Sequence, residues 1–327
     1  MIKNLEIINF KSIKHLNLEC KRINLFIGEP NTGKSNILET LALLSSIYHL
    51  RNRNVRDFIR FENMIDLYHD HFLENDIKVI FDKKTLEIHF KDGFFHGNYV
   101  NEEGRKITDI FRYDYQGSGT QLILADLTRD LAPFKFYRFH ILSAFPDKNS
   151  EFLNPPYGDN LLTILLVNKG LRAIIRQIFE RFGLILAFEP QEGKIRVQKQ
   201  LEEIVISFPY SAASETLQRL VFYLATIYSN KDSVIAFEEP EAHAFPYYTK
   251  YLAENIAQDK NNNQYFISTH NPYFLLSILE KAKKDEVAVF HTMLEDYQTK
   301  VKALTEAQIG DILEKGIDVF FDLERFR

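Results

Sequence analysis

The segment GEPNTGKS, residues 28–35, constrains the fold of this chain more than any other feature. Its glycines, lysine and serine satisfy the pattern G-x-x-x-x-G-K-[ST], in which a tight loop joins a strand to a helix. The apolar run RINLFI directly precedes the loop, and an amphipathic helix is expected over about residues 36–50. The sequence therefore predicts a strand, a phosphate-binding loop and a helix in that order.

The chemistry of the loop predicts that it binds a nucleotide. Glycines let the backbone N–H groups point at phosphate oxygens, and the N-terminus of the following helix favours the same anion. Lys34 is expected to neutralise the β- and γ-phosphates, and Ser35 to place its hydroxyl on Mg²⁺. The alternative is a chance match, which occurs in on the order of one chain in a hundred. The expected nucleotide contacts are Gly28, Glu29, Pro30, Asn31, Thr32, Gly33, Lys34, Ser35 and Asn36.

Two carboxylates follow a second apolar strand. Residues 234–237 lead directly into Glu238 and Glu239, and Pro240 ends the run. Ligands of open α/β sheets lie at the carboxyl ends of the strands, so both acids should reach the metal and phosphates held by the loop. One would hold Mg²⁺ through water, and the other would orient or deprotonate the attacking water. The alternative interpretation is a charged turn after a buried strand.

A histidine follows a third apolar strand in the segment NQYFISTHNPYF. Ser268, Thr269 and His270 end that strand, and Asn271 with Pro272 begins a turn or a helix. His270 could reach the γ-phosphate and the attacking water, whereas the alternative is a structural histidine. The phosphate loop and the paired carboxylates elsewhere in the chain favour the functional interpretation.

The composition excludes several classes of protein. The 327 residues are 45% hydrophobic and 26% charged, which is enough for one large domain or two closely packed ones. A net charge of -5 argues against a protein that coats nucleic acid through bulk positive charge. The single cysteine, Cys20, and the lack of a signal peptide or a long apolar run predict a cytoplasmic protein without a membrane span.

The order of strand and helix patterns predicts an α/β fold. Short alternating segments around residues 76–100 indicate a half-exposed antiparallel sheet, and residues 160–183 are expected to be helical. Beyond Ser214, helices alternate with continuous apolar strands, as in a parallel sheet that is buried on both faces. The chain contains no sustained heptad pattern, so a long coiled-coil arm is not expected.

These motifs together resemble the ABC-type ATPases, in the branch of the RecF, structural-maintenance-of-chromosomes (SMC) and overcoming-lysogenisation-defect (OLD) proteins. LEIINFKSIKHLNLE and the glycine loop are similar to the N-terminal sheet and Walker A motif of that branch. FEEPEAHAFP resembles its Walker B region, and ISTHNP resembles its histidine switch. The resemblance implies an ATPase head with a mixed or antiparallel β-lobe and a mostly parallel sheet flanked by helices. It implies one domain over residues 1–327 in two lobes, about 1–158 and 159–327.

The resemblance also implies roles for individual residues. Glu238 would be the Mg²⁺ ligand, where many relatives carry aspartate, and Glu239 the catalytic base. In SAASETLQRLVFYLATI, Ser214 matches the signature serine, but the glycine that normally follows is missing. Glu215 and Thr216 stand near that position. Ser214 is expected to cap its helix and to bind the nucleotide, by aiming its hydroxyl and the helix N–H groups at a γ-phosphate.

In this family two protomers sandwich two ATP molecules head to tail, so the resemblance implies an ATP-dependent homodimer. Glu241, Ala242 and His243 would lie at the seam between the protomers. The stretch after His270 is too short for the Toprim nuclease domain of many OLD proteins, so a nuclease or effector would be a separate chain.

Two functions remain open at this stage. The first is an ATP-hydrolysing enzyme coupled to DNA repair or to defence against phage or mobile elements. The second is a nucleotide-gated protein-interaction module with slow or no hydrolysis, which the missing signature glycine favours. A transport ATPase is a third possibility that the N-terminal segment favours less.

A run of arginines after the first helix is a candidate DNA contact, and the alternative is a solvated charged face. The run comprises Arg51, Arg53, Arg56 and Arg60. The cluster His69, Asp70 and His71 lacks the spacing of a helical metal site.

Overall fold

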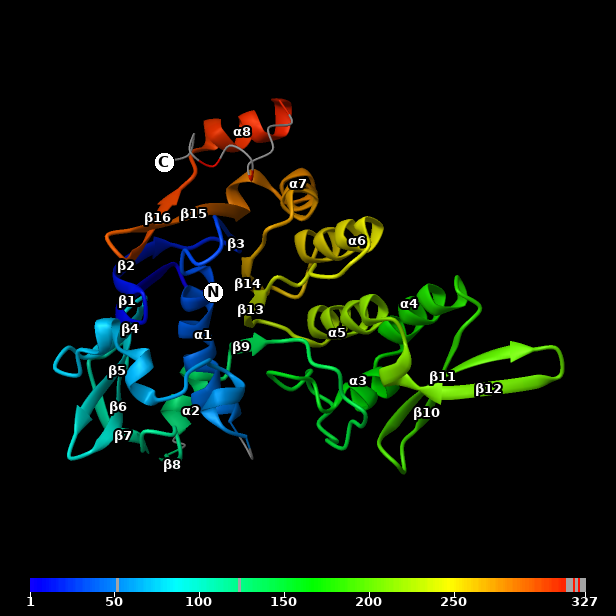
Figure 1. Ribbon diagram of the computed structural model, residues 1–327, viewed down its shortest axis with the longest axis horizontal. Coiled ribbons are helices and arrows are strands. Elements are labelled where there is room, and N and C mark those ends of the chain that lie inside the picture. Colours follow the sequence, from blue (N-terminus) through cyan, green and yellow to red (C-terminus); the bar gives the residue numbers. More distant parts are fainter. Residues whose placement is uncertain (51–52, 123–124, 316–319, 321–322, 324–327) are drawn as a thin grey trace.

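A six-stranded sheet places the glycine loop at the carboxyl end of a central strand (Figure 1). The computed structural model describes residues 1–50, 53–122, 125–315, 320 and 323 of the chain. Five strands of the sheet are parallel, and β16 pairs antiparallel at one edge. In spatial order the strands are β16 (Gln298–Ala303), β15 (Val287–Glu295), β3 (Ile23–Ile27), β14 (Gln264–Ser268), β13 (Val234–Glu238) and β9 (Phe134–Tyr137).

The parallel strands are buried on both faces because side chains of successive residues enter different cores. On β13, Ile235 and Phe237 belong to one hydrophobic cluster, whereas Val234 and Ala236 belong to the other. This alternation explains why the parallel strands are continuous apolar runs in the sequence. The predicted α/β fold with a mostly parallel sheet is confirmed.

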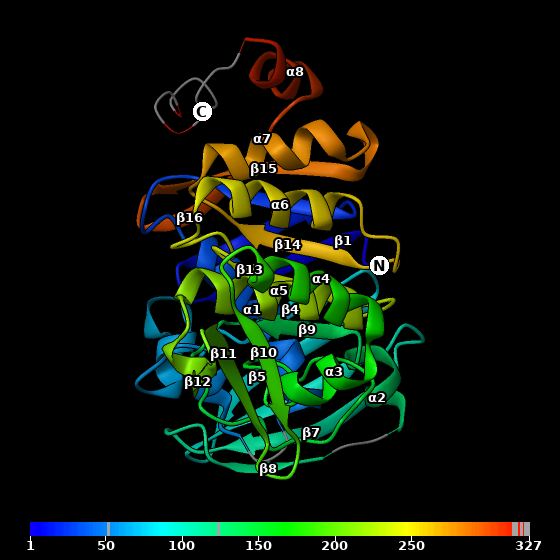
Figure 2. The ribbon, with the colours of Figure 1, turned by 90° about the vertical axis from the view of Figure 1, so that its right-hand side faces the viewer.

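Helices cover both faces of this sheet (Figures 1 and 2). The helix α1 (Lys34–His49) packs on one face, and a row of three helices covers the other. Helix α1 begins at Lys34, two residues earlier than the sequence predicted. The residue before it, Gly33, has a left-handed conformation and so ends the loop at this point. The three helices of the row are α5 (Glu215–Ser229), α6 (Pro246–Ala257) and α7 (Pro272–Lys281).

An antiparallel sheet of seven strands encloses the other side of α1 (Figure 1). Its strands alternate buried and more exposed residues, as expected for a sheet with one covered face. The antiparallel β-lobe that the sequence predicted is therefore confirmed. Its strands in spatial order are β2 (Ile13–Glu19), β1 (Asn4–Phe10), β4 (Ile77–Phe81), β5 (Lys84–Lys91), β6 (Phe94–Val100), β7 (Lys106–Tyr113) and β8 (Gly119–Gln121).

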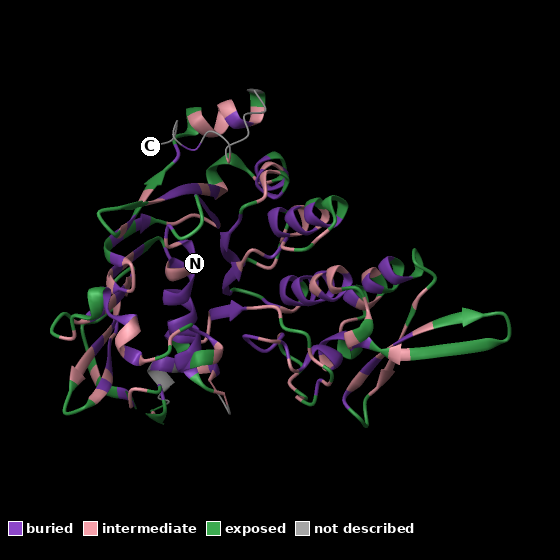
Figure 3. Ribbon diagram, in the orientation of Figure 1, coloured by how far each residue is buried: buried purple, intermediate pink, exposed green. Residues whose placement is uncertain are grey.

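A helical segment and a three-stranded sheet precede α5. The predicted helical region forms α3 (Leu161–Val167) and α4 (Lys169–Glu180). The sheet comprises β10 (Ile185–Glu189), β11 (Lys194–Leu201) and β12 (Ile204–Pro209). The β11–β12 hairpin extends away from the rest of the molecule, and its far end is exposed (Figure 3).

The remaining elements are short. Helices α2 (Ala125–Leu131) and α8 (Glu306–Lys315) complete the set of α-helices in the described ranges. Single 3-10 turns cover Val55–Asp57, Met64–Leu67, His69–His71, Tyr210–Ala212 and Lys284–Glu286. No helix in the part of the chain that the structure describes has the length and apolar character needed to cross a bilayer. The six-stranded sheet takes strands from both sides of residue 158, and the division into two lobes stays a prediction.

Candidate active site

The glycine loop has a conformation that only glycine tolerates at two positions. Gly28 and Gly33 have φ angles of 151° and 92°. A Cβ atom on Gly33 would lie 1.9 Å from Oγ1 of Thr299, and one on Gly28 would lie 2.3 Å from the carbonyl oxygen of Thr292. Both threonines belong to the β15–β16 hairpin, so the glycines are required for the loop to fit against this hairpin as well as for its turn.

The side chain of Lys34 is held inside the loop by two backbone carbonyl oxygens. Its Nζ donates to the carbonyl oxygens of Gly28 at 2.9 Å and Glu29 at 2.7 Å. Burial lowers the pKa of Lys34 to about 8, although the carboxylates of Glu239 and Glu29 act in the opposite direction. A bound phosphate would restore the charged form, because an anion close to a buried ammonium favours its protonation.

The start of α1 lines a cleft of about 580 Å³ together with the loop. Ser35 and Asn36 occupy the first turn of α1, where backbone N–H groups lack intrahelical partners. The side chain of Asn36 donates to Oγ of Ser12 at 2.6 Å, which ties the loop to the β1–β2 turn. The cleft is lined by Ser12, Pro30, Asn31, Thr32, Gly33, Lys34, Ser35, Asn36, Arg60, Glu239, His270, Leu294 and Tyr297.

Two of the residues predicted from separate strands meet in this cleft. Nε2 of His270 lies 3.3 Å from Oε1 of Glu239. Glu239 has a φ of 43°, and its backbone N–H donates to the carbonyl oxygen of Ser268 at 3.0 Å, across from β13 to β14. Burial and the nearby Lys34 lower the pKa of His270, which favours the neutral imidazole, although the carboxylate of Glu239 acts in the opposite direction.

The carboxylate of Glu238, which the sequence predicts to bind Mg²⁺, contacts two arginine side chains. Nη2 of Arg60 donates to Oε1 of Glu238 at 2.9 Å, and Nη2 of Arg138 lies 3.6 Å from Oε2. Arg60 also binds the buried carboxylate of Glu39, with Nε 2.8 Å from Oε1. Glu238 is therefore paired with two guanidinium groups and does not line the cleft.

The described arginines of the run, Arg53, Arg56 and Arg60, do not form a patch of unpaired cations. Arg60 binds Glu39 and Glu238, and Arg53 forms an ion pair with Asp159. Arg56 donates to the carbonyl oxygen of Glu62 at 2.6 Å and lies over the ring of Phe61. Arg51 lies outside the described residues. The described arginines thus stabilise this protein's own loop, which weakens the case for a phosphate-backbone contact here.

Ser214 lies at the N-cap of α5, as predicted, and outside the cleft. Its side chain is exposed and forms no capping hydrogen bond in the described protomer. Near the position of the missing glycine, Oγ1 of Thr216 donates to the carbonyl oxygen of His243 at 2.8 Å. Thr216 therefore connects the start of α5 to the turn that follows the paired carboxylates.

Glu241 is buried within the protomer, which differs from its expected place at a seam between protomers. It is 5% exposed, and Oγ1 of Thr269 donates to its Oε1. Burial raises the pKa of Glu241 to about 7. Glu241 therefore joins the carboxylate turn to the strand end that carries His270, whereas His243 is exposed.

Three residues that line the cleft were not predicted from the sequence. Ser12, Leu294 and Tyr297 line the cleft, but they belong to no nucleotide-binding pattern that could have identified them. In the cluster at residues 69–71, Nδ1 of His69 is 2.8 Å from the carbonyl oxygen of Lys11. Within the described ranges, no group of three or more histidine, cysteine, aspartate or glutamate residues could hold a metal ion.

A family model described as "AAA domain, putative AbiEii toxin, Type IV TA system" matches residues 23–277. That range extends from β3 to α7 and contains the glycine loop, the paired carboxylates and His270. The chain belongs to this family.

Relatives of this AAA domain include the DNA replication and repair protein RecF. The RecF of Clostridium kluyveri is 36% identical over 93 residues, which is 28% of this chain and 24% of that protein. The RecF of Clostridioides difficile is 35% identical over 68 residues, 20% of this chain and 18% of that protein. The matched part therefore spans no more than about a quarter of these relatives.

Solved SMC heads share the fold of the AAA domain. An SMC head bound to the C-winged helix domain of ScpA has a TM-score of 0.54 at 16% identity and covers 94% of this chain and 98% of its own. An SMC head with an extended coiled coil, bound to the C-terminal domain of ScpA from Pyrococcus furiosus, has a TM-score of 0.53 at 15% identity. It covers 96% of this chain and 98% of its own. The domain thus has the fold of these SMC heads, and it resembles RecF over the matched segments.

The residues of the AAA domain fit a nucleoside triphosphate and Mg²⁺. Lys34 and the first turn of α1 supply an ammonium and free N–H groups to one side of the cleft, which suits a chain of phosphates. Ser35 and Glu238 supply the hydroxyl and carboxylate oxygens that Mg²⁺ prefers. Glu238 would have to exchange Arg60 for the hydrated metal, so a metal site at these residues would be complete only after this ion pair opened.

Proposed function

We propose that this AAA domain binds ATP with Mg²⁺ and hydrolyses it. The observation that carries the proposal is the meeting of Glu239, His270 and Lys34 in one cleft, from three separate segments of the chain. A lysine in a glycine loop accounts only for nucleotide binding. Hydrolysis also needs a group that activates water, and a carboxylate oriented by a histidine is such a group.

Each side chain has a separate task in the proposed reaction. Lys34 and the first turn of α1 bind and orient the phosphates. The carboxylate of Glu239 accepts a proton from the attacking water, while the neutral His270 fixes its orientation by a hydrogen bond. Bound Mg²⁺, held by Ser35 and Glu238, would neutralise charge that develops on the phosphate oxygens.

We also propose that two copies pair head to tail around ATP. Ser214 is exposed at the N-terminus of α5, where its hydroxyl and the helix N–H groups are available to a phosphate on the partner's loop. The contact between Thr216 and His243 would transmit the position of α5 to the turn after Glu239. Pairing would then affect the catalytic carboxylate of the same protomer.

The cellular role that fits best is DNA repair or defence against phage and mobile elements. Support comes from the RecF relatives, named as DNA replication and repair proteins, and from the family description, which names an AbiEii toxin. DNA, or a separate nuclease or effector chain, is the proposed partner, and the kinship with the OLD proteins belongs to the same proposal. The single cysteine is consistent with a reducing cytoplasm.

A nucleotide-gated interaction module is the second candidate, and one observation favours it. Glu238 is held by Arg60 and Arg138 instead of facing the cleft. If this ion pair persists when ATP binds, the metal would lack its carboxylate and hydrolysis would be slow. The domain would then use ATP to switch between a free and a partner-bound form.

Steady-state ATP hydrolysis by the purified protein distinguishes the two candidates. The parent, Glu239→Gln and Lys34→Ala would be compared with and without duplex DNA. Turnover that DNA raises and Glu239→Gln abolishes supports the DNA-linked enzyme. ATP binding without turnover in the parent supports the interaction module, and ATP binding by Lys34→Ala equal to that of the parent contradicts the site itself.

A further inference from the structure

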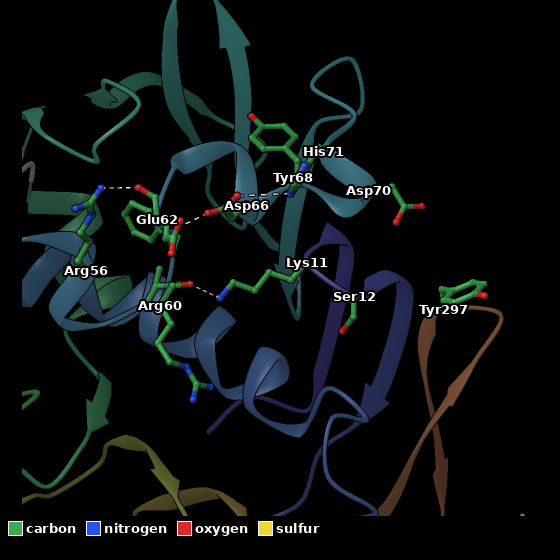
Figure 4. Close-up of a pocket in the computed structure, with 12 residues that line it drawn as sticks. Lys11, Ser12, Arg56, Arg60, Glu62, Asp66, Tyr68, Asp70, His71 and Tyr297 are labelled. Atoms are coloured by element: carbon green, nitrogen blue, oxygen red, sulfur yellow. Dashed lines mark hydrogen bonds and ion pairs between the residues drawn. The ribbon is translucent and has the colours of Figure 1, made fainter.

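A second and larger cavity adjoins the phosphate cleft. It has a volume of about 970 Å³ and lies among the β1–β2 turn, the loop after α1 and the tip of the β15–β16 hairpin (Figure 4). Ser12, Arg60 and Tyr297 line both hollows, so the two are continuous at these residues. A ligand with its phosphates on the glycine loop could therefore extend into the larger cavity.

Tyr297 stands at the junction as an unusually exposed aromatic residue. It is 89% exposed, and it forms a tight turn with Asp296, in which both residues have positive φ angles of 60° and 49°. Large aromatic side chains contribute most of their stabilising energy by being buried, so this ring contributes little to the folded protein itself. An exposed ring at the junction of two cavities is instead suited to packing against a ligand.

The hairpin holds this exposed ring at a fixed place relative to the glycine loop. Oγ1 of Thr299 is 2.6 Å from Oγ of Ser12, and Oγ1 of Thr292 is 2.8 Å from Oγ1 of Thr32. The close approach of Thr299 to Gly33 adds a third point of contact. Tyr297 is therefore exposed at its ring but anchored through the strands on either side of it.

The charges around the larger cavity indicate which part of a nucleotide it could accept. Its wall includes the carboxylates of Glu62, Asp66 and Asp70, which would repel phosphate. Its cationic side chains are already bonded within the protein. Lys11 binds Glu39 and the carbonyl oxygen of Arg60. Arg60 binds Glu39 and Glu238, and Arg56 donates to the carbonyl oxygen of Glu62. A planar, uncharged group with N–H donors suits this wall, and a nucleobase that carries an exocyclic amine, such as adenine, has that chemistry.

We propose that Tyr297 is the residue on which the base of the bound nucleotide stacks. The phosphates lie on the loop at residues 28–35, and the base occupies the mouth of the larger cavity against the phenol ring. This inference rests on the proposed nucleotide-binding function and adds a positioning residue to it. Stacking of a base on an aromatic ring corresponds to about 5- to 150-fold in Kd.

Binding measurements on the full chain test the proposal without requiring hydrolysis. The Kd of Mg²⁺-ATP and of Mg²⁺-tripolyphosphate would be measured by calorimetry for the parent, Tyr297→Ala and Tyr297→Phe. Tyr297→Ala should weaken ATP binding by about 5- to 150-fold and leave tripolyphosphate binding within about twofold, because only ATP carries a base. Tyr297→Phe keeps the ring and should bind ATP like the parent.

Tyr273→Ala is the matched control, since Tyr273 is a 64% exposed tyrosine on α7 that lines neither cavity. It should bind both ligands as the parent does. If Tyr297→Ala keeps the parent's affinity for ATP while Lys34→Ala loses both ligands, the nucleotide site stands and the role of Tyr297 is refuted. If the parent binds neither ligand, the proposed function and this inference fail together.

Discussion

Nε2 of His270 lies 3.3 Å from Oε1 of Glu239, although the two residues follow different strands of the six-stranded sheet. Parallel pairing of β13 with β14 places Glu238 beside Ser268, and so brings the residues after each strand to the same edge. The short contact holds the carboxylate of Glu239 at the cleft, where the side chain is otherwise partly exposed. The histidine thus restricts the orientations of the proposed base.

Replacing His270 by alanine should slow hydrolysis more than it weakens ATP binding. Without the imidazole, the carboxylate of Glu239 would sample orientations that do not face the attacking water. We expect kcat to fall by about 100-fold, as for loss of a positioned acid–base group, with the Kd of ATP within about threefold. Single-turnover hydrolysis and equilibrium binding would be measured on the same preparation. An unchanged kcat would show that His270 is structural.

Glu39 should be a strong determinant of stability because it is a buried carboxylate between two cations. It is 1% exposed and binds Lys11 and Arg60. Glu39→Ala would leave Lys11 mostly buried without its carboxylate, so we expect a loss of about 3 kcal/mol in the free energy of unfolding. Denaturation in urea checks this value.

Glu180→Ala provides the control for that measurement. Glu180 pairs with Arg176 one turn away on the exposed surface of α4, and such pairs contribute roughly 0.3 to 0.5 kcal/mol. A similar loss for Glu39→Ala and Glu180→Ala would mean that the buried network contributes no more than a surface ion pair.

The sequence predicted the parts of the site that depend on local pattern. The glycine loop has a fixed spacing, and the apolar strands before Glu239 and His270 predicted that both residues would lie at one sheet edge. The start of α1 differed by two residues, because the left-handed Gly33 ends the loop at a point that apolar periodicity does not mark.

The contacts between distant segments could not be predicted from the sequence. Arg60 and Glu238 are 178 residues apart, and their pairing depends on how the loop after α1 folds over the sheet. The same holds for Tyr297, whose turn reaches the cleft only because β15 and β16 pack beside the glycine loop. Each of these residues has an ordinary sequence context, and only the fold gives it a place in the site.

ATP binding should weaken as the pH rises above about 8. Burial lowers the pKa of Lys34 to about 8 in the free protein, so above this pH the free protein has lost the proton that a bound phosphate requires. Binding is then coupled to the uptake of one proton, and Kd should rise by up to about tenfold per pH unit. Calorimetry between pH 7 and 9.5 checks this slope. A Lys34→Arg variant that still binds should lack it, since a guanidinium stays charged.

Glu241 should make the protein less stable as the pH rises from about 5 to 8. The pKa of its carboxyl group has the ordinary value of 4.5 in the unfolded chain, but burial raises this pKa to about 7 in the folded protein. Between these values the folded state holds a proton that the unfolded state has released, so stability falls with increasing pH and then levels above 7. Glu241→Gln removes this effect and should gain on the order of 2 kcal/mol over the parent between pH 5 and pH 8. Urea unfolding at both pH values measures the difference, and Glu280→Gln on the exposed side of α7 should follow the parent at each. A Glu241→Gln curve parallel to the parent would mean that the buried carboxyl is already ionised at pH 5.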